Sequence, residues 1–179
     1  KATIAEGVYI GNVNVGGMTQ AQAQSAVEEY VAGLMDTTFT LKGESGSVSM
    51  TAQDMGVTAD VNAAVTEAVA VGRAGSLINR YKTTQDLKKN SLVLDMHLSV
   101  DKQTTAQKLY KDSDKLSVAA VDNGLVRENG AFQFVKGKEG VEVNIVDSVY
   151  AINDFLADEW NGTNNEIELV TDVVEPRGN

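Results

Sequence analysis

Cysteine is absent from the 179 residues of this chain, and His97 is its only histidine. The absence of cysteine excludes a thiol nucleophile, a disulfide framework and a zinc site with cysteine ligands. A single histidine also excludes a metal site built on a histidine pair. No catalytic motif brings a nucleophile or an acid to His97, so we interpret it as an exposed or cross-strand residue. The sequence predicts a protein that is not an enzyme, with no catalytic residue, no metal and no cofactor.

Positive charge and long apolar runs are also scarce. The 15 Lys and Arg residues are outnumbered by 25 Asp and Glu residues, which gives a formal net charge of −10. Nucleic acid and anionic lipid surfaces repel such a chain, so neither is an expected partner. No apolar run approaches the roughly 18 residues that a membrane span needs, and the start of the chain lacks the pattern of a signal peptide. We therefore expect a soluble piece of a longer protein.

Aromatic residues make up 6% of the chain and proline occurs once, at Pro176, whereas hydrophobic residues make up 42%. This hydrophobic content is too high for a disordered chain, and the core must be built mainly from aliphatic side chains and methionine. A compact fold of this length buries roughly 70% of the surface of its unfolded chain, so one domain or two small ones can form. Pro176 is expected to end regular structure, and residues 176–179 to begin a linker to an absent C-terminal domain.

One stretch of the sequence occurs twice. Residues 46–65, GSVSMTAQDMGVTADVNAAV, align without a gap with residues 130–149, GAFQFVKGKEGVEVNIVDSV, at an offset of 84 residues. The alignment retains glycines and apolar positions: Gly46 with Gly130, Val48 with Phe132, Met50 with Phe134, Gly56 with Gly140, Val57 with Val141, Val61 with Ile145 and Val65 with Val149. Polar residues differ, because Gln53 and Asp54 stand opposite Gly137 and Lys138. A catalytic motif would keep its polar groups, so we interpret the repeat as structural.

Local patterns predict a hairpin and then a helix in each copy. The hairpins fall at residues 39–50 and 118–135, and the Asn129-Gly130 pair favours a type I′ turn in the second. A helix follows each hairpin, because apolar residues recur there at helical spacing behind side chains that can cap a helix. The candidate N-caps are Asp60 or Asn62 in the first copy and Asn144 or Asp147 in the second.

A strand and a helix precede each hairpin. In the first copy, residues 8–15 form a strand with a bulge near Gly11, and Thr19 opens a helix. In the second, residues 92–100 alternate as one strand, and Asp101 caps a helix. The order is β-α-β-β-α followed by β-α-β-β-α-β. We predict an α+β fold with a duplicated β-α-β-β-α unit, antiparallel hairpins and two adjoining lobes: residues 1–90 with a connector, and residues 91–175.

One group of residues is a candidate binding site. Arg73, Asn79, Arg80 and Tyr81 follow the end of the first-copy helix in an otherwise acidic chain. An arginine fork beside an aromatic face suits a ligand that carries a carboxylate, such as a sugar-peptide. In the structural alternative, Arg73 binds the carbonyl end of its helix and Tyr81 packs between the lobes. Trp160, which ends the last helix, joins the candidate site if a cleft between the copies gathers these residues.

Several motifs together resemble one protein family. They are GVYIGNVNVGGMT at residues 7–19, DMGV at 54–57, GRAGSLINRYK at 72–82, and GAFQF at 130–134 with Gly140. The chain resembles, over nearly its whole length, the N-terminal region of VanW-like (YoaR-like) proteins of Gram-positive bacteria. That region carries a peptidoglycan-binding domain, which is also found ahead of L,D-transpeptidase catalytic domains.

The resemblance implies an extracytoplasmic cell-wall module that binds peptidoglycan or its stem peptides. It also implies a membrane anchor before Lys1 and a further domain after the last residue. The transpeptidase relatives use a cysteine in another domain, which agrees with a noncatalytic chain. The family has no fixed set of ligand residues, so the resemblance implies no site. The alternative is a structural spacer or protein-interaction module that positions a C-terminal domain among cell-wall protein partners.

Overall fold

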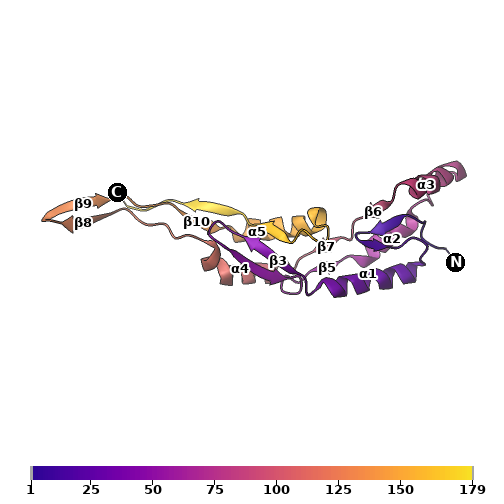
Figure 1. The fold of residues 1–179 in the computed structure, drawn as a ribbon, viewed down its shortest axis with the longest axis horizontal. Coiled ribbons are helices and arrows are strands. Elements are labelled where there is room, and N and C mark those ends of the chain that lie inside the picture. The colour runs from indigo at the N-terminus through magenta and orange to yellow at the C-terminus, as the bar shows by residue number, and fades with distance from the viewer. Residues whose placement is uncertain (1, 179) are drawn as a thin grey trace.

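The computed structural model describes residues 2–178, so Asn179, the last residue of the predicted linker, lies outside the described residues. The chain folds into an elongated series of small sheets and helices (Figure 1). The strands are β1 (Val8–Ile10), β2 (Val13–Asn14), β3 (Thr38–Lys42), β4 (Ser47–Thr51), β5 (Thr58–Ala59), β6 (Leu92–Leu94), β7 (Leu98–Ser99), β8 (Gly124–Glu128), β9 (Ala131–Val135), β10 (Gly140–Val143), β11 (Glu166–Glu168) and β12 (Thr171–Val174). The helices are α1 (Gln20–Leu34), α2 (Val61–Ala70), α3 (Leu77–Lys89), α4 (Lys102–Leu116), α5 (Ile145–Asp154) and a π-helical turn, η1 (Phe155–Glu159). The predicted α+β class is confirmed, and the element order is compatible with a duplicated unit.

Two three-stranded sheets define two lobes. The first lobe has the strand order β2-β1-β6 and is packed with α1 and α2, and the second has the order β11-β3-β4 and is packed with α4 and α5. In each sheet, an antiparallel hairpin accepts a parallel strand along its first strand: β6 along β1 and β11 along β3. Two antiparallel pairs, β5–β7 and β10–β12, follow the first and second lobes respectively. Figure 1 shows the lobes in series, with α3 at one end and β8–β9 at the other.

The two lobes exchange strands along the chain. The β3–β4 hairpin leaves from between α1 and α2 and lies in the second lobe, whereas β6 returns to the first lobe and pairs with β1. The pairing of β1 with β6 sets Val8 opposite Leu92, which are related by the same offset of 84 residues as the sequence repeat. The halves of the chain are therefore interlocked, and neither lobe is built from one half alone.

The core is built from aliphatic residues, as the composition predicts. Phe39 is the one aromatic residue among the largest fully buried side chains of the described residues, with Ile10, Leu41, Leu109 and others around it. Apolar burial of this kind is the main favourable term in folding. No helix in residues 2–178 is both long and apolar enough to cross a membrane.

The helix caps follow local sequence signals. The Thr19 hydroxyl and the Gln22 side chain form a complete capping box at the start of α1. Asp60 accepts the Ala63 N–H at the start of α2, and Asn144 accepts the Asp147 N–H at the start of α5. These findings confirm the predicted caps and select Asp60 and Asn144 from the alternatives.

The predicted bulge near Gly11 is wrong. Residues 8–15 form two antiparallel strands, with Tyr9 opposite Asn14 and Ile10 opposite Val13. Gly11 has a φ of 54°, which a tight two-residue hairpin turn requires at its first central position. The turn reverses the chain, and this reversal produces the shift in apolar spacing that a bulge also produces.

The predicted single strand at residues 92–100 is wrong as well. It breaks between β6 and β7, because His97 adopts a φ of 58° and its N–H donates to the Asp95 carboxylate at 2.8 Å. This local hydrogen bond lets the chain turn from the first sheet to the β5–β7 pair. Val146 and Tyr110 are exposed, because the buried faces of their helices follow Val149 and Leu109.

Candidate ligand-binding site

A cavity of about 330 Å³ lies where the first lobe meets η1 and the loop that follows it. Its walls come from the β1–β2 turn, from α1, from β6 with residues 95–98, and from residues 156–162. These segments are far apart in sequence, and the exchange of strands between the lobes brings them together. The polar and aromatic lining residues are Asn12, Tyr30, Asp95, Asp158, Trp160 and Asn161.

Asn12 connects the two sides of the cavity. Its Nδ2 donates to the Tyr30 hydroxyl and to the Asn161 carbonyl oxygen, both at 3.2 Å. Gly162 adjoins this amide with a φ of 96°, and a Cβ there would lie 2.5 Å from Asn12 Nδ2. The close approach therefore requires glycine at this position. Asn12 uses its amide donors within the protein, and its Oδ1 remains an acceptor on the cavity wall.

Trp160 forms the aromatic wall. Its indole Nε1 donates to the Asn165 side chain at 2.9 Å. Its ring forms an edge-to-face pair with the Phe39 ring, with centroids 5.6 Å apart at an interplanar angle of 62°. These two contacts fix the ring against the core of the second lobe. The side chain is only partly buried, so part of the indole faces the cavity.

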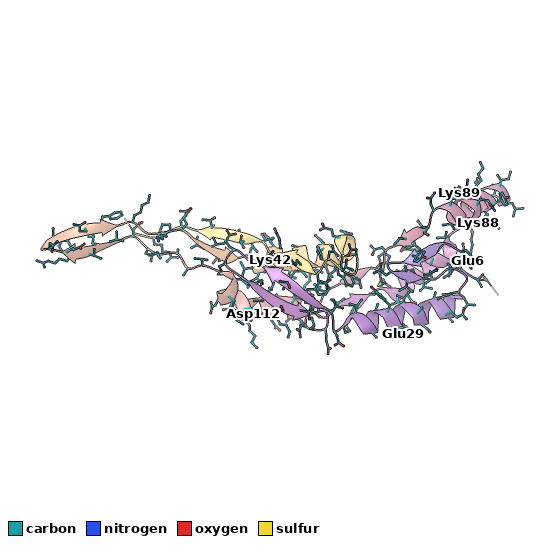
Figure 2. The ribbon with its side chains drawn as sticks, in the orientation of Figure 1. Glu6, Glu29, Lys42, Lys88, Lys89 and Asp112 are labelled. Carbon is teal, nitrogen blue, oxygen red and sulfur yellow. The ribbon has the colours of Figure 1, made fainter. Side chains whose placement is uncertain are left out.

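A second, more open groove of about 580 Å³ adjoins the first cavity. It shares Asn12, Tyr30, Trp160 and Gly162 with the first cavity and continues along α1 past Glu29, which Figure 2 labels. Both hollows therefore present a tryptophan and a tyrosine to solvent. Concave, mostly apolar surfaces with a few convergent polar groups are typical of ligand sites.

The charge at the first cavity is negative. Asp95 and Asp158 line it and are exposed, and its described lining residues include no lysine or arginine. Nearby, the carboxylate of Glu67 accepts a hydrogen bond from His97 Nε2 at 2.6 Å and raises the pKa of that imidazole. The arrangement of aromatic rings, amides and carboxylates suits a ligand with hydroxyl, amide or ammonium groups.

The structure places the predicted arginine–tyrosine group elsewhere. Arg73 donates from Nε to the Val69 carbonyl oxygen at 2.6 Å and from Nη2 to the Thr3 carbonyl oxygen, so its guanidinium binds the end of α2. Asn79, Arg80 and Tyr81 lie on α3, at the end of the molecule opposite the β8–β9 hairpin (Figure 1). Tyr81 is 66% exposed, so it does not pack between the lobes. Of the predicted site residues, Trp160 lines the cavity, and the other four are not among its lining residues.

Sequence reasoning missed Asn12, Tyr30 and Asn161 as partners. Residues 161–164 form a turn, in which the Asn161 Oδ1 accepts the Thr163 and Asn164 N–H groups. Its contact with Asn12 spans 149 positions of the sequence. No local pattern predicts such a pair. The one signal in the sequence is that an asparagine stands beside a glycine in both segments, at Gly11-Asn12 and at Asn161-Gly162.

A family model described as "Putative peptidoglycan binding domain" matches residues 48–164. This range runs from β4 to the loop after Trp160, so it includes Asp95, Asp158 and Asn161 but not Asn12 or Tyr30. Neither the curated proteins nor the solved structures gave a significant match.

Proposed function

The chain belongs to the family described as putative peptidoglycan binding domain, and we propose that it is a noncatalytic cell-wall module that binds peptidoglycan in the cavity at Trp160. Family membership supports a binding role at the cell wall, outside the cytoplasm. The observation that carries the proposed site is the aromatic and amide wall formed by Trp160, Tyr30 and Asn12 between the lobes.

The chemistry of peptidoglycan fits this wall. Its sugars present hydroxyl and N-acetyl groups, and its stem peptides present amides and ammonium groups. Trp160 and Tyr30 offer rigid amphipathic faces for a sugar ring, and the Asn12 Oδ1 can accept a hydrogen bond from an amide. Asp95 and Asp158 attract an ammonium group electrostatically. We therefore propose a stem peptide with its adjoining sugar as the ligand.

The surface of α3 is the second proposed contact. Arg73 is engaged at the end of α2, so Arg80 is the arginine free to bind a stem-peptide carboxylate, with Asn79 and Tyr81 beside it in sequence. Figure 2 labels Lys88 and Lys89 at the end of the same helix, which gives α3 a basic character in an acidic protein. This surface would bind the anionic parts of the same polymer.

An NMR titration with purified muropeptides tests these proposals. Trp160 is the only tryptophan, so its single indole N–H signal should shift at millimolar ligand. Asp158→Asn should weaken binding severalfold, since an exposed ion pair contributes roughly 0.2–1 kcal/mol. Asp154→Asn, which changes an exposed acid of α5 outside the cavity lining, is the matched control. Arg80→Ala with Tyr81→Ala tests α3.

The titration separates the two sites. If the indole signal does not move while the α3 signals do, the cavity is not the site. If neither region responds at millimolar muropeptide, and cell wall pulls down the Arg80→Ala, Tyr81→Ala variant as well as the parent, both proposed sites are refuted.

A structural spacer is the second candidate function, and the elongated arrangement of the lobes favours it (Figure 1). In this proposal the lobes hold a C-terminal domain away from a membrane anchor, as the resemblance to VanW-like proteins implies. Crosslinking on intact cells should then recover a cell-wall protein partner, and muropeptides should cause no shifts. Release of the full-length protein from membranes by salt alone would contradict the anchor.

A further inference from the structure

The hairpin of β8 and β9 forms a two-stranded sheet of its own, at one end of the molecule (Figure 1). Every residue of both strands is exposed, including Phe132 at 71%, Leu125 at 66% and Phe134 at 55%. Leu125 lies opposite Phe134 and Arg127 lies opposite Phe132, so these four side chains share one face. We call this surface the aromatic face. Contiguous apolar surface of this kind marks an interaction site.

The β3–β4 hairpin is the counterpart of β8–β9 in the first copy. Each hairpin leaves from between the two helices of its copy, and the offset of 84 residues aligns β4 with β9. The four positions of the aromatic face have direct counterparts in β3–β4, and all four counterparts are buried. The matched residues are Met50 with Phe134, Val48 with Phe132, Phe39 with Leu125 and Leu41 with Arg127.

The second lobe covers the β3–β4 hairpin. Helix α4 packs against β4, and β11 adds in parallel along β3 with Ile167 opposite Leu41. The hairpin turn meets the end of the same helix, where Ser45 donates to the Ser117 carbonyl oxygen at 3.4 Å. The cover therefore consists of one helix over the face and one strand along the edge.

The first lobe repeats this arrangement on the β1–β2 hairpin. There β6 adds in parallel along β1, and α1 and α2 pack against the sheet. Two hairpins of the chain thus carry a lobe of the same kind, and β8–β9 leaves from between two helices as β3–β4 does. We propose that the aromatic face of β8–β9 is the docking surface for a further α+β lobe, which lays a helix across Phe132 and Phe134 and adds a strand parallel to β8.

The path of residues 175–178 supports this occupant. Residues 117–123, which lead from α4 to β8, are more numerous than residues 35–37, which lead from α1 to β3, so β8–β9 stands farther from its lobe. Residues 175–178 follow this longer stem: the Arg177 carbonyl oxygen accepts the Asn123 N–H at 2.8 Å, and the Arg177 N–H donates to Asp122 at 3.0 Å. The backbone that leaves the β10–β12 pair is thereby brought to the base of β8.

Charge on the hairpin specifies the chemistry of the partner. Lys42 of β3 forms an ion pair with Glu166 of β11 at 3.3 Å, and Glu128 occupies the position of Lys42 in β8. The docking strand should therefore carry a lysine or arginine opposite Glu128, and the lobe an acid near Arg127. A second copy of this chain is a poor occupant, because its own α4 and β11 already cover its β3–β4 hairpin.

Single-cysteine labelling tests the proposal, because the chain has no cysteine of its own. The probe is the full chain with a second run of residues 101–178 appended after Gly178. The β8–β9 hairpin of the original chain carries Arg127→Leu and Glu128→Lys. These substitutions give β8 the side chains that β3 has at the matched positions, Leu41 and Lys42. Leu125→Cys in that hairpin should react with a maleimide about tenfold more slowly than in the unextended chain, as expected for a locally protected site.

Val126→Cys is the matched control, because it lies on the opposite face of β8. Its labelling rate should change by less than about threefold, since docking covers the other face. Met50→Cys, in the covered hairpin, gives the rate of a protected site. A second extended variant keeps Arg127 and Glu128, and its protection should be weaker.

Three results would overturn the proposal. The first is equal labelling of Leu125→Cys in the extended and unextended chains, in both hairpin versions. An appended lobe that stays unfolded would also overturn the proposal, because the appended residues can complete their sheet only by pairing with the β8–β9 hairpin. The second is protection of the unextended chain that rises with protein concentration, which would make a second copy the occupant. The third is protection by muropeptides, which would make the face a glycan site.

Discussion

The two copies of the repeated stretch share a helix and differ in a hairpin. The helices α2 and α5 start at positions related by 84 residues, each behind a capping side chain, and each packs against the other helix of its lobe. The β3–β4 hairpin is buried in the second lobe, whereas β8–β9 is exposed. A repeated pattern of apolar residues thus fixes local structure, and what packs on it decides whether it belongs to the core.

The largest expected difference between the hairpins is in stability. Phe39→Ala should lower the free energy of unfolding by about 3–5 kcal/mol, because it leaves a cavity under Trp160. Leu125→Ala, at the matched position, should change it by less than about 0.5 kcal/mol. Urea unfolding followed by circular dichroism measures both. A loss above about 1 kcal/mol in Leu125→Ala would mean that the second hairpin is covered in solution.

The turns of the hairpins should respond to alanine for different reasons. A Cβ on Gly43 would lie 2.9 Å from the Leu116 carbonyl oxygen, so Gly43→Ala should cost about 1–3 kcal/mol through overpacking. Gly130 has a φ of 81° and open space around it, so Gly130→Ala should cost roughly 1 kcal/mol from the left-handed backbone. Asparagine separates the causes: it should restore stability at position 130 but not at position 43. If asparagine restored stability at both positions, the close packing of α4 on the turn of the β3–β4 hairpin would be contradicted.

The helix caps test the part that the copies share. Asp60→Ala and Asn144→Ala should each lower the free energy of unfolding by about 1 kcal/mol, because each removes the acceptor of one N–H group at a helix start. Asn144 also donates to Asp172 at 3.0 Å, so its loss should be the larger. Asn144→Asp keeps the cap but loses that donor, and it should fall between Asn144→Ala and the parent in chemical denaturation. If only one of the two substitutions lowered the stability, the two caps would not stabilise their helices alike, and this prediction would be wrong.

Local signals explain why much of the fold could be predicted from the sequence. Thr19, Asp60 and Asn144 act within three residues of their own position, and the Asn129-Gly130 turn has positive φ at both residues as its sequence requires. The exchange of strands between lobes could not be predicted in this way. It depends on pairings such as β1 with β6 and β3 with β11, which no short pattern specifies.

Only one residue that the sequence selected, Trp160, lines the cavity described above. Trp160 was selected as the one tryptophan at a helix end, and it does line the cavity. Its neighbours Asn12 and Tyr30 come from the first lobe and meet it only through the tertiary fold. The sequence allowed two roles for Arg73, ligand binding or contact with the carbonyl end of its helix. The structure shows the contact with the end of α2. A ligand role for Trp160, Asn79, Arg80 and Tyr81 remains a prediction.

The smallest expected difference between the copies is a pH dependence confined to the first lobe. His97 lies among the acids Glu67, Asp95 and Asp60, and its pKa is raised above its usual value of 6.5, chiefly by the hydrogen bond that its Nε2 donates to the Glu67 carboxylate. Ala151 of α5 stands where Glu67 stands in α2, so the second lobe has no such pair at this position.

The sign of this effect follows from the direction of the shift. The folded state holds the proton on His97 more tightly than the unfolded state, so the stabilisation is complete below pH 6.5 and is lost as pH rises through the folded pKa. Glu67→Gln should therefore lower stability at about pH 5.5 by up to roughly 1 kcal/mol, since the pair is partly exposed, and have little effect at about pH 9. Glu28→Gln, which removes the same charge from the exposed side of α1, is the control. Hydrogen exchange should place the loss in α2 and spare α5, and an equal loss at both pH values would mean that Glu67 stabilises the lobe without the imidazolium.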